Sequence, residues 1–163
     1  MTPPVADREC RSALRRSAPS IVYFAQGLPG FDGLRRWELV EREETRPFLW
    51  LRAVERPQVA LLVADPCDLV DGYEPAIPAG VWSRLGAGSE TRGLTLVVVS
   101  VSGAEMSANL RAPLVLDPQT MRGEQVILEQ GEWPVRFGLT PHEDGATQPG
   151  TGRSLACSSS VER

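Results

Sequence analysis

The stretch Leu94-Thr-Leu-Val-Val-Val-Ser-Val101 decides the fold class of this chain. It consists mainly of aliphatic and β-branched residues, which favour extended strands. Its apolar run is almost unbroken, and that is typical of a strand that is covered on both faces or closed around a core. Two earlier runs, Phe48-Leu-Trp-Leu51 and Val59 to Ala64, have the same character. We therefore expect a sheet in which several strands have little solvent-exposed face.

Shorter strand patterns lie on either side of these three runs. Further strands are predicted at Ile21–Phe24, Leu34–Val40, Met106–Ala112, Leu114–Leu116 and Gln125–Leu128. The chain contains 15 Gly and 14 Pro, and this density favours short strands and turns over long helices. The predicted fold class is all-β and mainly antiparallel, a small barrel or a sandwich with one or two short helices.

Two segments between the strands have helical signals. Pro66 to Asp71 can form one helical turn, with Asp65 as its N-cap and proline at the first helical position. Ala79 to Leu85 places three apolar residues on one face and is followed by Gly86, which is a typical helix-ending residue.

The sequence divides into three parts. Residues 1–20 form either a loose arm or a weak first strand. Residues 21–139 contain all the clear strands and form the predicted β domain. Residues 140–163 have few apolar side chains, so they cannot bury enough surface to offset the entropy lost on ordering, and we expect a disordered tail.

Charge and cysteine content narrow the class of function. The 163-residue chain has a formal net charge of -4, so direct nucleic-acid binding is not expected. All 17 basic residues are arginine. Three scattered cysteines (Cys10, Cys67 and Cys157) and the lack of a secretory signal indicate reduced thiols in the cytoplasm. No apolar stretch is long enough to span a bilayer, so no membrane partner is expected.

Residue patterns for catalysis or metal binding are missing from the sequence. The single histidine, His142, lies in the polar tail, and no cysteine cluster has zinc-ligand spacing. Cys67 follows Pro66 at a possible helix start, where a thiol can be activated, but a small, semi-buried thiol is the better interpretation. The glycine pairs at 27 and 30 and at 86 and 88 lack the residues of a phosphate-binding loop. We expect no enzyme activity, no metal and no cofactor.

One charge pattern indicates binding. Between Gln58 and Ser83 the chain has four acidic residues and no arginine. These residues are Asp65, Asp68, Asp71 and Glu74, and a second acidic stretch contains Glu38, Glu41, Glu43 and Glu44. If the two stretches meet in space, they form a negative patch that steers a basic partner; the alternative is an ordinary solvated surface.

Aromatic residues are candidate anchors for a partner. Trp37 and Trp50 lie within strand-like runs and are expected in the core. Phe31, beside a Gly-Pro-Gly turn, and Tyr73, among acidic residues, are expected to be exposed.

Seven short strings occur in a specific order along the chain. They are Gly27-Leu-Pro-Gly-Phe31, Phe48-Leu-Trp-Leu51 followed by Val54-Glu55 and Pro57, Asp65-Pro66, Tyr73-Glu-Pro75, Ser107-Ala-Asn-Leu-Arg-Ala-Pro113, Gly123-Glu-Gln-Val-Ile-Leu128 and Trp133-Pro-Val-Arg136. In order and spacing this set resembles the FliW family of flagellar assembly factors over roughly residues 21–139. Three features depart from the family pattern. The first strand is barely visible before Ile21, which puts closure of the barrel in question or indicates a misassigned start codon. Asp117 replaces a frequent asparagine, and the tail beyond Leu139 is longer than usual.

The resemblance implies a fold and a function. Members of the FliW family form a small β-barrel-like domain and bind two proteins, flagellin and the carbon storage regulator CsrA, an RNA-binding translational repressor. The FliW-like protein sequesters CsrA and so releases flagellin mRNA, while surplus flagellin captures the FliW-like protein and frees the repressor. A basic, RNA-binding partner suits an acidic patch.

The residues expected to bind partners fall into three groups. They are the acids Asp65, Asp68, Asp71 and Glu74; the turn residues Gly27, Pro29, Gly30 and Phe31; and Asn109, Leu110 and Pro113. The two glycines can equally serve only the turn, and Asn109 can equally serve only a buried backbone group. The alternative function is a small β-barrel that binds a ligand or flavin, which requires a deep, polar-lined cavity.

Overall fold

The computed structural model describes residues 20–86, 93–129 and 133–139. Within them the chain forms nine strands, one α-helix and two 3-10 helices. The strands are β1 (Ser20–Phe24), β2 (Arg36–Glu41), β3 (Leu49–Ala53), β4 (Ala60–Ala64), β5 (Leu94–Ser102), β6 (Glu105–Ala108), β7 (Leu114–Asp117), β8 (Arg122–Gln125) and β9 (Phe137–Leu139). The helices are η1 (Glu43–Thr45), η2 (Pro66–Asp68) and α2 (Ala79–Leu85). The expected N-terminal arm, apart from Ser20, and the expected tail lie outside the described residues.

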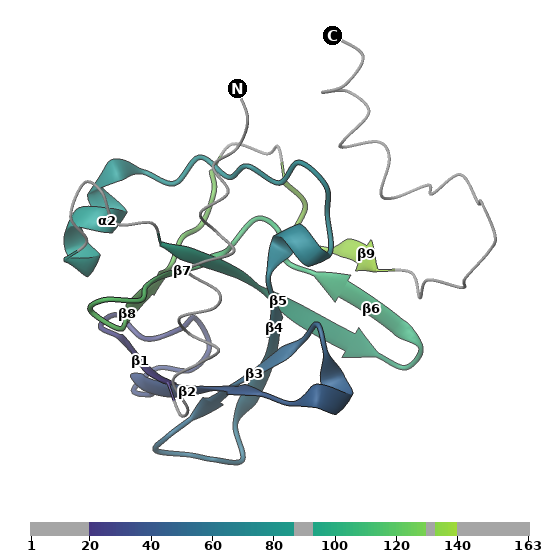
Figure 1. The fold of residues 1–163 in the computed structure, drawn as a ribbon, viewed down its shortest axis with the longest axis horizontal. Coiled ribbons are helices and arrows are strands. Elements are labelled where there is room, and N and C mark those ends of the chain that lie inside the picture. The colour runs from purple at the N-terminus through teal and green to yellow at the C-terminus, as the bar shows by residue number, and fades with distance from the viewer. Residues whose placement is uncertain (1–19, 87–92, 130–132, 140–163) are drawn as a thin grey trace, which may run out of the picture.

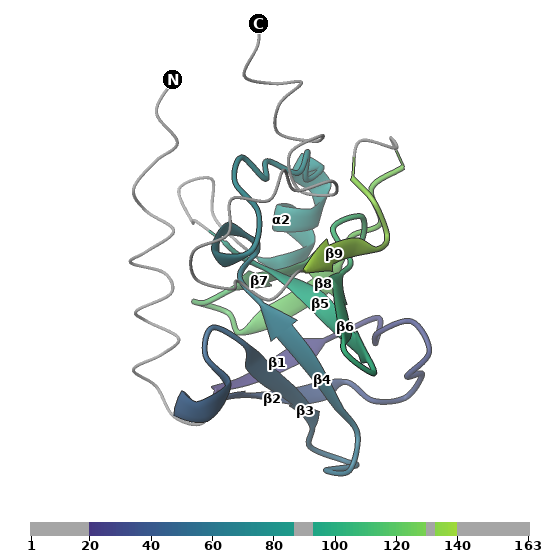
Figure 2. The ribbon, with the colours of Figure 1, turned by 90° about the vertical axis from the view of Figure 1, so that its right-hand side faces the viewer.

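Seven strands close into a barrel in the order β4-β3-β2-β1-β8-β7-β5, because β5 also pairs with β4 (Figure 1). The strands β6 and β9 continue the sheet from β5 and lie side by side next to the barrel (Figure 2). Every pair is antiparallel except β1 and β8, which pair in parallel through Tyr23 with Arg122 and Phe24 with Gly123. The predicted all-β barrel is confirmed, and the strands described here are enough to close it.

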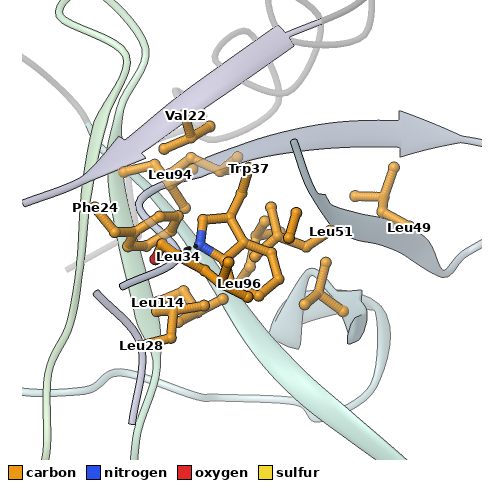
Figure 3. Close-up of a cluster of buried hydrophobic side chains, with 13 residues drawn as sticks. Val22, Phe24, Leu28, Leu34, Trp37, Leu49, Leu51, Leu94, Leu96 and Leu114 are labelled. Atoms are coloured by element: carbon orange, nitrogen blue, oxygen red, sulfur yellow. Dashed lines mark hydrogen bonds between the residues drawn. The ribbon is translucent and has the colours of Figure 1, made fainter. Parts of the chain in front are cut away.

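Apolar side chains fill the interior of the barrel. One cluster of 13 buried residues surrounds Trp37, as Figure 3 shows. The Trp37 side chain is 0% exposed, and its indole nitrogen donates a 3.2 Å hydrogen bond to the carbonyl oxygen of Leu34. The placement of Trp37 in the core is confirmed, whereas Trp50 is only half-buried. A barrel packed in this way counts against the ligand- or flavin-binding alternative.

The long strand β5 is buried on both faces over much of its length. Leu94 and Leu96 belong to the interior cluster, whereas Val97 and Val99 belong to a second cluster outside the barrel wall. This second cluster also contains Val70, from the chain that follows η2, and residues of β6 and β9. As predicted, the apolar run of β5 is continuous because a hydrophobic cluster packs against each face of the strand.

The helix α2 covers another part of the barrel wall, beside β7 and β8 (Figure 1). Its residues Val81 and Leu85 pack against Val115, which points away from the barrel interior, in a third buried cluster. Gly86 ends the helix with a positive φ of 78°, a conformation that glycine adopts at little cost. Both predicted helical segments are confirmed, with the one at Pro66 reduced to a single 3-10 turn.

Two strand predictions need correction, and one further strand was missed. The alternating pattern predicted to run from Met106 to Ala112 ends at Ala108, because the chain turns at Asn109. The strand predicted at Gln125–Leu128 is assigned three residues earlier, as β8. Strand β9 was not predicted, since a run of three residues containing glycine has too little pattern to identify.

Candidate partner-binding site

Residues 65–74, the acidic segment, leave the barrel at the end of β4. The carboxylate of Asp65 accepts a 2.8 Å hydrogen bond from the backbone nitrogen of Cys67, and this capping bond begins η2. Asp65 is only 6% exposed, so its visible role is to shape the segment. Asp68, Asp71 and Glu74 are exposed and supply the negative charge of its surface.

Two apolar side chains hold the acidic segment against the second cluster. Val70 is 2% exposed and Tyr73 is 7% exposed. The Tyr73 hydroxyl donates a 2.7 Å hydrogen bond to the carbonyl oxygen of Leu110, and its ring meets Trp133 edge to face with centroids 4.6 Å apart. The expectation that Tyr73 is an exposed anchor is therefore wrong, because its hydroxyl and its ring both contact residues inside the protein. Burial also raises the pKa of the Tyr73 hydroxyl.

The second acidic stretch leaves the same end of the barrel wall. The start of β3 pairs with the end of β4 through Leu49 and Val63, so the chain entering β3 and the acidic segment emerge side by side. Phe48, just before β3, packs against the second cluster as well. The two acidic stretches are separate in the sequence, and they come close because β3 and β4 pair in this antiparallel register.

Two arginines offset part of the charge of the second stretch. Glu38 forms an ion pair with Arg52 across β2 and β3. The Nε atom of Arg46 lies 3.0 Å from the Glu41 carboxylate, and its guanidinium approaches the Glu43 carboxylate at 3.8 Å. The acidic segment beside it adds three exposed acids, Asp68, Asp71 and Glu74.

The turn at Asn109–Pro113 lies against the acidic segment, because Leu110 accepts the Tyr73 hydrogen bond. The side-chain oxygen of Asn109 accepts hydrogen bonds from the backbone nitrogens of Arg111 and Ala112, at 3.1 and 3.2 Å. Leu110 and Pro113 are buried. The structure thus gives all three predicted residues an internal role, and a direct contact with a partner stays a prediction.

The turn at Gly27–Phe31 lies elsewhere. It joins β1 to β2, whereas the chain from β2 to β3 leaves from the opposite end of β2, next to the acidic segment. Gly27 and Gly30 have positive φ values of 70° and 84°. Pro29 and Gly30 are exposed, while Phe31 is half-buried and meets Trp37 edge to face at 5.8 Å. The structure therefore does not bring this turn together with the acids, and Phe31 is less exposed than expected.

A third surface feature contains only one of the residues predicted to bind partners, Gly27. Nine residues line an open recess of about 260 Å³ between β1, β8 and the end of α2. Three of them carry charge: Arg84, Arg122 and Glu124. These residues come from distant parts of the chain, so only the fold brings them together.

Two features are absent from the described residues. Ranges 20–86, 93–129 and 133–139 contain no group of three or more His, Cys, Asp or Glu side chains placed to hold a metal ion. In the same ranges no helix has the length and apolar character to cross a membrane. His142, Cys10 and Cys157 lie outside the described residues, and Cys67 is exposed rather than semi-buried as expected.

Comparisons with known proteins agree on one family. A family model described as FliW protein matches residues 8–139. A flagellar assembly factor FliW from Thermotoga neapolitana is 33% identical over 129 residues, which cover 77% of this chain and 87% of that protein. A flagellar assembly factor FliW from Leptospira interrogans is 32% identical over 123 residues, covering 74% of this chain and 82% of that protein.

A solved structure extends the likeness to three dimensions. The crystal structure of a flagellar assembly factor FliW superposes with a TM-score of 0.70 at 29% sequence identity, covering 76% of this chain and 88% of that one. Sequence, family model and fold thus agree over most of the described barrel. This chain belongs to the FliW family.

Proposed function

We propose that this chain is a non-catalytic, cytoplasmic flagellar assembly factor that binds flagellin and CsrA in turn. In its CsrA-bound state it antagonises repression of flagellin mRNA translation. In its flagellin-bound state it releases CsrA, so that translation follows the supply of free flagellin. The family membership and the names of its relatives support the role in flagellar assembly.

The acidic segment is the observation that carries the proposal for CsrA. Asp68, Asp71 and Glu74 are exposed on a stretch that Val70 and Tyr73 fix to the second cluster. A negative surface on a fixed backbone attracts a basic, RNA-binding partner at long range and loses little conformational entropy on docking. The same charge repels RNA, which favours antagonism over formation of a ternary complex with the message.

A direct test uses the purified full chain, CsrA and flagellin from the same organism. CsrA is first bound to a labelled RNA from the flagellin leader, and the chain is added while RNA binding is followed by fluorescence anisotropy. We expect anisotropy to fall as CsrA is sequestered and to recover when flagellin is added. Failure of the chain to retain CsrA or flagellin in affinity capture, at both low and moderate salt, would overturn the proposal.

A further inference from the structure

The recess between β1, β8 and α2 is open because a pair of strands diverges there. β1 and β8 pair in parallel over only two positions, ending at Phe24 and Gly123. β1 then stops and the chain turns through Ala25, Gln26 and Gly27, whereas β8 runs on to Gln125. The recess of about 260 Å³ lies at this divergence, and Leu85 at the end of α2 adds to its wall.

One wall of the recess is held rigidly. Arg84 on α2 donates two hydrogen bonds to the carboxylate of Glu124 on β8, from Nε at 3.0 Å and from Nη2 at 2.6 Å. A two-point contact of this kind fixes the planes of both groups. It also neutralises Glu124, which is the acidic residue among those that line the recess.

Arg122 is the charge that remains. It lies opposite Tyr23 in the β1–β8 register, its side chain is exposed, and no described residue forms an ion pair with it. Tyr23 is 40% exposed, and Ile21, on the same outward face of β1, is 45% exposed. The surface therefore combines a rigid wall, two exposed apolar side chains and a guanidinium that can donate hydrogen bonds to a carboxylate.

We propose that this recess is a second docking surface, which binds an acidic segment of a protein partner through Arg122 and Tyr23. Charge complementarity selects the occupant: a carboxylate pairs with the free guanidinium, and a neighbouring apolar side chain packs against Tyr23 and Ile21. The volume of the recess suits side chains of a peptide better than a large cofactor. Its net positive character also distinguishes it from the acidic segment, which attracts a partner of the opposite charge.

The test is a peptide-display selection on the immobilised full chain, with a random twelve-residue library as the probe. Selected peptides are synthesised, and their affinities are measured for the wild type and for Arg122→Glu, Tyr23→Ala and the control Arg56→Glu. Arg56 is an exposed arginine in the turn between β3 and β4, outside the recess. Thermal unfolding of each variant establishes that the barrel is intact.

We expect enrichment of peptides that carry Asp or Glu next to an apolar residue. Arg122→Glu should weaken their binding at least about tenfold, and Tyr23→Ala should weaken it as well, while Arg56→Glu leaves it within about twofold. Replacing the peptide carboxylate by a lysine ammonium should restore binding to Arg122→Glu. If the selection yields no peptide whose binding depends on Arg122, the proposal is wrong. This outcome is independent of CsrA and flagellin capture, so it leaves the proposed function to its own test.

Discussion

The hydroxyl of Tyr73 donates a 2.7 Å hydrogen bond to the carbonyl oxygen of Leu110, 37 residues further along the chain. This bond joins the acidic segment to the turn at Asn109–Pro113. Both residues are buried, at 7% and 0% exposure. The acidic segment and the turn at Asn109–Pro113, two of the three groups predicted to bind partners, are therefore joined in one region. The geometry of that region depends on the Tyr73–Leu110 hydrogen bond.

Tyr73→Phe is expected to lower the free energy of unfolding by about 1–2 kcal/mol, because the Leu110 carbonyl oxygen loses its side-chain donor in a buried position. Urea unfolding followed by tryptophan fluorescence measures the loss. Tyr23→Phe is the matched control, since Tyr23 is 40% exposed and its hydroxyl has no hydrogen bond within the described residues. Equal stability of the two variants would contradict the role assigned to the Tyr73 bond.

The stability of the wild type should also fall in alkaline solution. Burial raises the pKa of the Tyr73 hydroxyl above its ordinary value of 10.0, so the folded state keeps a proton that the unfolded state releases. This contribution is fully present below pH 10 and is lost as the pH rises further, with a slope of up to about 1.4 kcal/mol per pH unit. Urea titrations from pH 9 to about pH 11 should show a steeper loss for the wild type than for Tyr73→Phe. Parallel curves would mean that Tyr73 does not titrate differently on folding.

The sequence was informative about strands and less so about surfaces. The β-branched run of β5 and the capping signals at Asp65 and Gly86 are local, and local physics is enough to place them. Tyr73 was misjudged because its acidic neighbours in sequence suggest exposure, whereas its burial depends on Leu110 and Trp133. The residue pattern within the acidic segment does not reveal its contacts with Leu110 and Trp133, which lie far along the chain.

Closure of the barrel shows the same limit. The parallel pairing of β1 with β8 joins Phe24 to Gly123, about a hundred residues apart, and no pattern within either strand specifies its partner. The recess at this pair was missed for the same reason. The acid-rich composition of the two stretches identifies them in the sequence. Their closeness in space follows from the pairing of Leu49 with Val63. Residues that act locally were predictable from sequence, and residues that act through long-range pairing were not.

Asn109 allows a structural role to be separated from a binding role. Asn109→Ala removes the acceptor of two backbone hydrogen bonds and should destabilise the protein by about 1–2 kcal/mol. Asn109→Asp keeps an oxygen in the same place and should be close to the wild type in stability. Measured CsrA and flagellin affinities of the stable Asp variant then report on direct contact. If Asn109→Asp is as unstable as Asn109→Ala, the side-chain oxygen is not what holds the turn.

Gly123 is required for close packing where β8 meets β1. A Cβ atom at this position would lie 2.7 Å from the ring of Phe24, which is 1% exposed and cannot move aside without disturbing the core. Gly123→Ala should therefore cost about 1–3 kcal/mol. Gly138→Ala, in β9, is the control, because a Cβ there meets no atom within 4 Å, and its stability should change by no more than about 0.5 kcal/mol. Thermal unfolding of the two variants provides the comparison, and a small loss for Gly123→Ala would show that the barrel wall adjusts.

Charge reversal on the acidic segment gives the sharpest test of how CsrA is recognised. Asp71→Arg and Glu74→Arg each replace an exposed carboxylate by a cation, and we expect each to weaken CsrA binding about tenfold, mainly through slower association. Glu105→Arg makes the same change at an exposed position of β6 and should have little effect.

The dependence on salt separates steering by charge from other causes of weaker binding. Exposed charges are screened over about 8–10 Å at physiological ionic strength, so the association rate of the wild type should fall as salt is added. The two reversed variants should show a shallower salt dependence than the wild type, whereas Glu105→Arg should follow it. Stopped-flow association at several salt concentrations measures both quantities. If Asp71→Arg and Glu74→Arg bind CsrA as fast as Glu105→Arg at low salt, the partner does not recognise the acidic segment by its charge.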